Sequence, residues 1–560
     1  MKTFRYLVLL LVCSVSLMTL AQTPKYVKKA SKSLLNVLSY DAEGKLLCST
    51  NGFLIGENEV VTDYHSLKGA RGVICVDYKG KEYPISRILG ASALYDVVRF
   101  SITGASKLDP LRVAAASGLK SEEVYIMPYL SKQNMVGEST TIEDASLFAD
   151  IYYYYTLPVR AQEKYLSCPI MNIEGDVLAL LQKPSTAEDT HSYALSVPYA
   201  QSLQVTALSA NVQDYKDIRI AKALPADASQ ASSFIYLTGT ADTTLFLTYT
   251  EDFMRMFPAE ATGYTLRADM MAAMGRYDEA DALWQQGLDA GAASDEVLYA
   301  RAKTLYENLA ARHDTLPATW TFDETLNTIR AAKEAQPLPL YTSLEAQVLY
   351  AQQDYAAAGE CFVALNATSM RCAENFLYAA QCRQMLGDTL AVLALQDSAV
   401  ACFTKPYMPD AAPSLLMRAT TLLSLERYNE AVQDLNEYER LQRRNLNANF
   451  YYQRHQAEMK CRMYQQALDD IDEACKMEPR EPLYLTERAA LYYRFGETDE
   501  AIKSVRQAIA LDDTFADAHR ILGVCLRQQG NEAEAKQTLQ RAAQLGDEMA
   551  ARILEQPANP

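Results

Sequence analysis

The chain has 560 residues, of which 49% are hydrophobic and 22% charged, and its formal net charge is −17 at pH 7. This length exceeds what one hydrophobic core supports, so several domains are expected, and the composition is typical of a globular protein rather than a disordered one. The acidic balance argues against nucleic acid as the main partner, because phosphate binding needs clustered Lys and Arg.

The first 21 residues have the pattern of a secretory signal peptide. Lys2 and Arg5 precede an apolar run over residues 6–20, and the small residue Ala21 follows as a cleavage point. The run is interrupted by polar residues and is shorter than the roughly 20 residues of a membrane-spanning helix. We therefore predict cleavage of 1–21, a mature protein without a transmembrane segment, and an exported, periplasmic location.

Residues 33 to about 200 alternate apolar and polar positions with period two. KLLCSTNGFLIGENEVVTDYH predicts two strands joined at residues 56–59, and GVICVDYKGKEYPISRILG predicts a hairpin. Further short strands follow at spacings of roughly 8–12 residues, a pattern that indicates an all-β barrel or sandwich. We assign this β domain to residues 22–210.

The cysteines indicate free thiols or disulfides rather than a metal site. Of the eleven cysteines, ten follow residue 21, none forms a C-x-x-C pair, and no histidine joins a cysteine cluster. Export permits disulfides, and Cys48 and Cys75, expected on neighbouring strands, are the predicted pair. The cysteines in helical segments are expected to be small buried hydrophobes. No phosphate-binding or dinucleotide-binding motif is present, so no cofactor is predicted.

From about residue 225 the period changes to 3.6 and the sequence repeats. GRYDEADALWQQGL at 275, ERYNEAVQDLNEY at 426 and RMYQQALDDIDEA at 462 share one landmark, which places unit starts near 261, 295, 339, 373, 412, 448, 482 and 516. Four of the seven spacings are 34 residues, the length of the tetratricopeptide repeat, a helix–turn–helix unit.

Small residues support this assignment, because the two helices of such a unit cross closely at positions 8 and 20. The pairs are Ala268/Ala280, Ala346/Ala358, Ala419/Ala431, Ala489/Ala501 and Gly523/Ala535. We predict about eight repeats over 261–553, a linker with a degenerate capping repeat over 211–260, and a tail over 554–560.

Over roughly residues 30–210 the β domain resembles the trypsin-like serine proteases, especially their periplasmic HtrA-type branch. NGFLIGENEVVTDYHSL resembles the segment that carries the general-base histidine, which falls at His65. LYDVVRFSI resembles the strand that follows the histidine-orienting aspartate, which falls at Asp96. EEVYIMPYL and SYALSVPYAQSL resemble later strands of the same family. The resemblance implies a double β-barrel with a catalytic cleft.

The segment EKYLSCPIMNIEGDVLAL resembles the family's serine motif, G-x-S-G-[GS]-P, without its serine. Counting back three residues from Pro169 places Leu166 at the nucleophile position, and Lys164 and Ser167 replace the flanking glycines. A leucine cannot attack a carbonyl, and glycine lets the backbone amides of such a loop converge on an oxyanion. The resemblance therefore predicts a protease fold that has lost its nucleophile.

Two other nucleophiles remain open. Ser167 could act if the loop slipped by one residue, and Cys168 could act as a thiol with His65 as its base. Both stand in the wrong register relative to Pro169. The alternative for His65 and Asp96 is a retained hydrogen-bonded pair that stabilises the interface of the two barrels, which we favour because a triad without one member keeps only residual activity.

The repeats predict a binding groove lined by the first helix of each unit. By analogy with the family, unit positions 2, 5, 9, 12 and 13 face this groove. In the last units these positions include Tyr452, Lys460, Tyr493, Arg494, Arg520 and Arg527. A cationic groove edged by aromatic rings suits an acidic peptide or the C-terminus of a partner protein. An ordinary solvated helix face is the alternative.

Together these patterns predict an all-β trypsin-like double barrel followed by an all-α repeat solenoid, acting as an exported scaffold that binds a protein or peptide. One alternative is an active periplasmic peptidase whose repeats recruit substrate. The other is a regulator that binds peptides without cutting them and controls a related protease. The missing serine favours the first interpretation.

Overall fold

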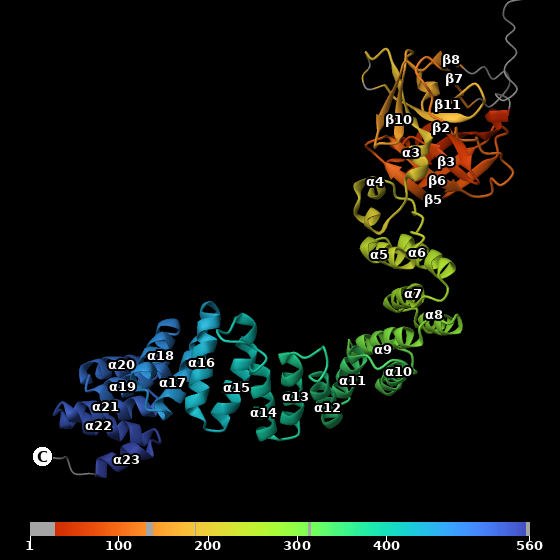
Figure 1. Cartoon of the computed structure of the whole chain (residues 1–560). Coiled ribbons are helices and arrows are strands. Elements are labelled where there is room, and N and C mark those ends of the chain that lie inside the picture. The colour runs from red at the N-terminus through yellow and green to blue at the C-terminus, as the bar shows by residue number, and fades with distance from the viewer. Residues whose placement is uncertain (1–28, 130–137, 185, 187, 312–314, 556–560) are drawn as a thin grey trace, which may run out of the picture. The chain divides into compact units, whose positions relative to one another are not determined.

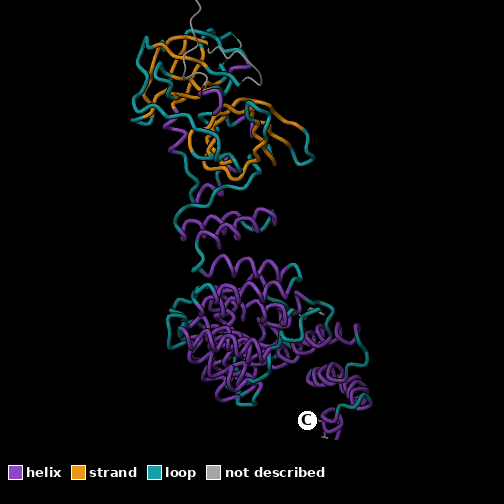
Figure 2. The backbone as a smooth tube through the Cα atoms, turned by 90° about the vertical axis from the view of Figure 1, so that its right-hand side faces the viewer, coloured by secondary structure: helices purple, strands orange, loops and turns teal. Residues whose placement is uncertain are grey.

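The computed structural model describes residues 29–129, 138–184, 186, 188–311 and 315–555. The predicted signal peptide and the last five residues of the predicted tail lie outside these ranges. The chain divides into two compact units at residue 300. Strands dominate up to residue 196 and helices dominate from there on (Figure 2), which confirms the predicted order of an all-β and an all-α part. None of the helices within the described ranges has the length and apolar character needed to cross a bilayer.

The first barrel is a closed antiparallel sheet with the strand order β1-β2-β3-β6-β5-β4 (Figure 1, red to orange). Its strands are β1 Leu34–Tyr40, β2 Leu46–Gly56, β3 Glu59–Thr62, β4 Gly72–Val76, β5 Glu82–Ser92 and β6 Val97–Ile102. The period-two pattern turns alternate apolar side chains inward, so Val60 and Phe100, which face each other across β3 and β6, are both fully buried.

The second barrel is built from a seven-stranded antiparallel sheet of order β8-β7-β11-β12-β13-β10-β9. Its strands are β7 Glu123–Ile126, β8 Glu138–Thr141, β9 Asp144–Phe148, β10 Tyr152–Leu157, β11 Pro169–Met171, β12 Val177–Gln182 and β13 Ser192–Ser196. The two edge strands, β8 and β9, are consecutive in the chain. Strand β12, buried at every position, lies at the centre of the sheet.

The segment predicted as linker and capping repeat packs on the first barrel. It contains α4 Gln213–Lys216, α5 Ala228–Thr238 and α6 Thr243–Met256, after the short α3 Val197–Ser202. Phe234 and Tyr249 share one apolar core with Ile88 of β5. An ion pair of 2.6 Å between Arg87 and Asp252 closes the contact. The segment is therefore part of the barrel's own core and not a free connection.

The helix pairs begin within one residue of the predicted unit starts. They are α7 Ala261–Ala273 and α8 Tyr277–Asp289, α9 Ser294–Ala310 and α10 Phe322–Ala335, α11 Pro339–Ala351 and α12 Tyr355–Leu365, α13 Ala373–Met385 and α14 Thr389–Val400, α15 Ala412–Ser424 and α16 Tyr428–Gln442, α17 Ala448–Lys460 and α18 Tyr464–Met477, α19 Pro482–Phe495 and α20 Thr498–Leu511, and α21 Ala516–Gln528 and α22 Glu532–Gln544. A further helix, α23 Glu548–Glu555, packs on the last pair.

The small residues at positions 8 and 20 are needed where predicted. Ala419 and Ala431 are fully buried at the crossing of α15 and α16. At Gly523 an added Cβ would lie 2.6 Å from Cγ of Leu539, closer than carbon atoms approach one another. The crossing distance therefore excludes larger side chains at this position.

A second regularity joins the two helices of three successive units. An arginine at unit position 7, in the first helix, donates to a side-chain oxygen at unit position 23, in the second helix. The pairs are Arg418 with Asp434, Arg454 with Asp470, and Arg488 with Ser504. Arg454 is the most buried of the three arginines, which makes its charge the costliest to leave unpaired.

The predicted disulfide between Cys48 and Cys75 is wrong. The two residues do not lie on neighbouring strands, because β1 lies between β2 and β4. Cys48 lies opposite Ser39 on one side of β1, and Cys75 lies opposite Val37 on the other side. All ten cysteines within the described ranges are free thiols.

Candidate functional site

The first barrel brings His65 and Asp96 together. His65 begins the short 3₁₀ helix His65–Leu67 three residues after β3 ends, and Asp96 directly precedes β6. The Asp96 carboxylate accepts from the backbone N–H of His65 at 3.1 Å and lies 2.7 Å from Nδ1 of its ring. A carboxylate accepts only, so Nδ1 carries the proton and Nε2 is left facing solvent. The His65 side chain is 68% exposed, so this half of the site keeps the geometry of a base and its orienting acid.

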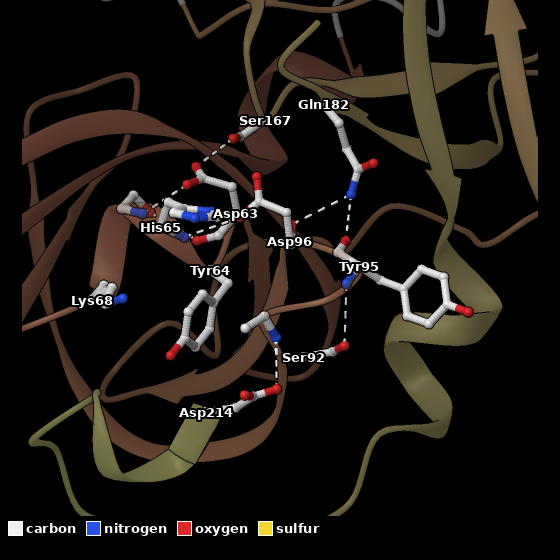
Figure 3. Close-up of polar contacts among 12 residues, drawn as sticks. Asp63, Tyr64, His65, Lys68, Ser92, Tyr95, Asp96, Ser167, Gln182 and Asp214 are labelled. Atoms are coloured by element: carbon white, nitrogen blue, oxygen red, sulfur yellow. Dashed lines mark hydrogen bonds and ion pairs between the residues drawn. The ribbon is translucent and has the colours of Figure 1, made fainter. Parts of the chain in front are cut away.

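A second-barrel residue that the sequence did not suggest supports this pair. Gln182, buried at the end of β12, donates from its amide to the backbone oxygens of Tyr95 and Asp96 (Figure 3). Its amide oxygen accepts from the Tyr154 hydroxyl. The turn that carries Asp96 is thus held from both barrels. Only the three-dimensional fold brings β12 to this turn, so no local signal marks Gln182.

The loop that should supply the nucleophile has its amides turned inward. Residues 163–165 form a 3₁₀ turn, and three consecutive N–H groups of the loop donate to backbone oxygens. The pairs are Leu166 with Glu163, Ser167 with Leu181, and Cys168 with Tyr165. On the other side, the Asn51 amide donates to the Leu166 carbonyl at 2.7 Å. An oxyanion hole needs free N–H groups aimed at one point, and these N–H groups are already used.

Ser167 is hydrogen-bonded away from the histidine. Its hydroxyl donates to the Asp63 carboxylate at 2.6 Å, and Thr50 donates to the same carboxylate oxygen at 3.2 Å. Figure 3 shows Ser167 directed at Asp63. The serine is 1% exposed and has a left-handed φ of +62°. Among the described residues no hydrogen bond joins Ser167 to His65, so the carboxylate of Asp63 holds the hydroxyl that a slipped loop would need.

Cys168 faces the interior of the second barrel. It is fully buried in an apolar cluster with Ile170 and Leu178, and its sulfur lies 3.9 Å from the Lys164 carbonyl. Burial raises the pKa of the Cys168 thiol far above its ordinary value. The reactive form of a cysteine is the thiolate, so this position suits packing and not attack.

Four of the five residues predicted at the catalytic site, all but Cys168, line one open cleft of about 710 Å³. His65, Asp96, Leu166 and Ser167 all contribute to its wall, together with Asp63. The cleft is therefore of a size to admit an extended peptide, although the loop lacks a nucleophile directed at His65. Within the described ranges no group of three or more His, Cys, Asp or Glu side chains could hold a metal ion.

In the repeats the structure separates the six predicted groove residues into two kinds. Lys460 lines a pocket of about 560 Å³, and Tyr452 stacks beside it on His455 and packs against Tyr484. Tyr493 is half-buried against the core of the last repeats.

The three predicted groove arginines are engaged within the chain. Arg494 lies over the Tyr464 ring at 4.2 Å. Arg520 pairs with Asp547 at 2.6 Å and with Asp517. Arg527 donates to the Ile553 carbonyl and lies 3.7 Å from Glu532. Lys460 is thus the one predicted groove cation with no such partner among the described residues.

A family model for the tetratricopeptide repeat matches residues 456–514 and 486–550. The small glutamine-rich tetratricopeptide repeat-containing protein 2 of Mycosarcoma maydis is 30% identical over 87 residues, which are 16% of this chain and 25% of that protein. The chain thus spans about a quarter of the length of that relative.

Similar solved structures include the active form of the Rv3671c protease from M. tuberculosis. It is 19% identical, covers 32% of this chain and 82% of its own, and has a TM-score of 0.28. A serine endoprotease from Yersinia pestis is 13% identical, covers 31% of this chain and 62% of its own, and also has a TM-score of 0.28. Neither likeness assigns a role to a residue of this chain. The chain thus combines a closed six-stranded β-barrel and a seven-stranded antiparallel sheet with a helical part, and residues 456–550 of that part match the tetratricopeptide repeat.

Proposed function

We propose that this protein is a non-cutting scaffold that binds other proteins through its repeats and keeps its protease-like barrels as a structural or peptide-holding part. The observation that carries the proposal is the state of the loop over residues 163–168. Leu166 stands at the nucleophile position, and the N–H groups of residues 166–168 donate to backbone oxygens. Nucleophile and oxyanion stabilisation are therefore missing together, which removes most of what such an enzyme contributes to rate.

The repeats supply the binding half of the proposal. Solenoids of this kind expose an extended surface whose units contact only their neighbours, and such surfaces recognise proteins and peptides. The pocket of about 560 Å³ beside Lys460 lies on this part of the chain, where the side chains of one unit meet those of the next.

A peptide-binding regulator is the second candidate, and the open barrel cleft favours it. His65 is exposed in a cleft of about 710 Å³, and its Nε2 is free to meet a peptide. Such a cleft could hold a peptide without cleaving it. If the protein is such a regulator, the repeats bind one segment of a partner protein and the cleft binds another.

Hydrolysis is the direct test of the non-cutting proposal. The full-length protein is incubated with an unstructured protein and with a mixed peptide library, and products are read by mass spectrometry. His65→Ala is the matched control, because it removes the only base of the remnant pair. We expect the same uncut pattern from both proteins. Products made by the wild-type protein and absent with the variant would establish a peptidase.

Export is proposed from the N-terminal residues alone and has its own test. The intact mass of the protein purified from its native host should correspond to a chain that begins at Gln22, after removal of residues 1–21. A native protein that retains Met1 or residues 2–21 would contradict export by this signal.

A further inference from the structure

One repeat departs from the rule at position 8. The other seven predicted units carry alanine or glycine there, whereas the unit that begins at Ala448 carries His455. The ring is inserted where α17 and α18 cross, and it is 1% exposed. The pocket of about 560 Å³ is lined by this histidine, so the departure from the repeat pattern and the pocket occur at the same place.

The hydrogen bonds of His455 fix its tautomer. Nδ1 lies 2.8 Å from the backbone oxygen of Ala467 in α18. A carbonyl oxygen can only accept, so Nδ1 donates and carries the proton. In the neutral ring Nε2 is then an acceptor with a lone pair and no hydrogen.

This lone pair faces another acceptor. The nearest oxygen of Glu487, in the first helix of the next unit, lies 3.8 Å from Nε2, beyond the range of a hydrogen bond. A neutral imidazole nitrogen and a carboxylate oxygen cannot bond to each other without a donor between them. The His455 ring is buried, whereas the Glu487 side chain is 38% exposed, so a donor can reach the pair from the pocket. The pair is therefore short of one N–H donor.

No side chain of the described residues supplies that donor. Lys460 lines the same pocket, but its ammonium makes no hydrogen bond or ion pair within the described ranges. The Gln456 amide donates to the Tyr452 hydroxyl at 2.8 Å and is thus directed elsewhere. The place between the two acceptors is thus open to a donor from outside the chain.

We propose that this pocket receives a lysine side chain of a partner protein, whose ammonium bridges Nε2 of His455 and the carboxylate of Glu487. The inference rests on the proposed function of the repeats as a binding surface. A primary ammonium is a compact donor with three N–H groups that can point at two separate acceptors, whereas a guanidinium fork fits two parallel oxygens of one carboxylate. The gap of 3.8 Å between single acceptor atoms matches the first donor and not the second.

Lys460 adds a second requirement. A cation in the same pocket would repel a lone lysine, so the partner's lysine should be followed or preceded by an acidic residue that pairs with Lys460. The recognised element is then a short lysine–acid pair in an exposed segment. This differs from the acidic peptide expected from the sequence, because the groove arginines that would have bound it are paired within the chain.

The test uses the full-length protein and fluorescein-labelled nine-residue peptides of Gly and Ser with a central pair of residues. The pairs are Lys-Asp, acetyl-lysine-Asp, Arg-Asp and Lys-Ala, and binding is read by fluorescence anisotropy. We expect the Lys-Asp peptide to bind at least tenfold tighter than its acetylated form. Glu487→Gln should weaken Lys-Asp at least tenfold, and acetylation should cost nothing further in that variant. Glu478→Gln, an exposed change in the unit of His455 that does not line the pocket, should leave binding unchanged.

Three results would overturn the inference: no binding of Lys-Asp, equal binding of the acetylated peptide, or independent effects of acetylation and Glu487→Gln. These results leave the proposed scaffold function testable on its own. A native partner that binds the Glu487→Gln variant as tightly as the wild-type protein would keep the scaffold and reject the lysine pocket. Peptide cleavage that depends on His65 would reject the non-cutting scaffold and leave the pocket untouched.

Discussion

The barrel cleft and the repeat pocket differ in how their polar groups are satisfied. In the cleft, Ser167 donates to Asp63 and the Leu166 carbonyl accepts from Asn51, so the groups that would perform chemistry bind one another. In the pocket, His455 and Glu487 present two acceptors with no donor between them. Internal hydrogen bonds therefore occupy the cleft's reactive groups, whereas the pocket presents two acceptors to which a ligand can donate.

This difference has opposite consequences for the stability of the two sites. A cleft whose hydroxyl and amides are internally bonded gains stability and loses reactivity, because each buried bond contributes about 0.5–1.5 kcal/mol. A pocket with an unmatched pair loses a little stability and gains specificity.

The largest effect is expected from Arg454→Met in the repeats. Arg454 is the buried cation that faces Asp470 and Glu439, each at 2.7 Å. Its loss leaves the buried Asp470 carboxylate without a counter-charge, which costs about 3–5 kcal/mol. Chemical denaturation of the full-length protein followed by circular dichroism measures the loss of helix. Arg506→Met, which removes an exposed pair with Glu534, is the control and should cost less than about 1 kcal/mol.

The next largest effect is expected on the stability of the first barrel, from Asp63→Ala. The variant removes the acceptor used by Ser167, Thr50 and the backbone N–H of Ser66. Buried donors left without partners cost about 1–3 kcal/mol, so the barrel transition in thermal unfolding should fall by several degrees. Glu57→Ala, an exposed change in the same barrel, should have no such effect. An unchanged barrel transition in Asp63→Ala would show that the bond between Ser167 and Asp63 does not stabilise the closed loop.

A smaller and pH-dependent effect is expected for Glu458→Gln. Burial, reinforced by the Asp470 charge, raises the pKa of Glu458 to about 8. The unfolded chain releases this proton near pH 4.3, so between about pH 5 and 8 the folded state holds more protons and its stability falls as pH rises. Glutamine cannot titrate. The variant should therefore match the wild-type protein near pH 5 and become the more stable of the two as the pH rises to 8.

Urea denaturation at pH 5, 6.5 and 8 measures this difference, with the repeat helices followed by circular dichroism. A difference in the free energy of unfolding between variant and wild type that stays constant with pH would show that Glu458 does not hold a proton in the folded state.

The smallest expected effect is that of Leu166→Ser. A hydroxyl at the nucleophile position does not change the backbone of the loop. The N–H of residue 166 still donates to the Glu163 carbonyl, and Lys164 still stands where the family has a glycine. Without an oxyanion hole the added serine should give no measurable hydrolysis of ester or peptide substrates. Turnover in this variant that disappears with His65→Ala would show that the loop can still open its amides.

The sequence predicts the repeats well because their rules are local. Position 8 and position 20 need small residues, and Ala419 and Ala431 are buried where the spacing requires. The pairing of His65 with Asp96 likewise follows from two short motifs, and the structure places them 2.7 Å apart. Each of these features depends on residues at a fixed spacing or in a fixed motif.

Features that depend on distant residues could not be predicted. The hydroxyl of Ser167 is held by Asp63, which is 104 residues away in the sequence. Strand neighbours follow the topology of the barrel, so the prediction that Cys48 and Cys75 lie side by side fails because β1 separates them. The groove cations also look free in the sequence, and only the fold shows that Arg520 is paired with Asp547.

Activity-based labelling tests the central claim most directly, namely that no nucleophile in the cleft is aimed at His65. The full-length protein is treated with a fluorophosphonate probe and with a thiol-reactive peptide probe, beside the His65→Ala and Ser167→Ala variants. We predict that neither probe labels the cleft of any of the three proteins. Covalent labelling of Ser167 or Cys168 that is lost in His65→Ala would contradict the account and identify a working protease.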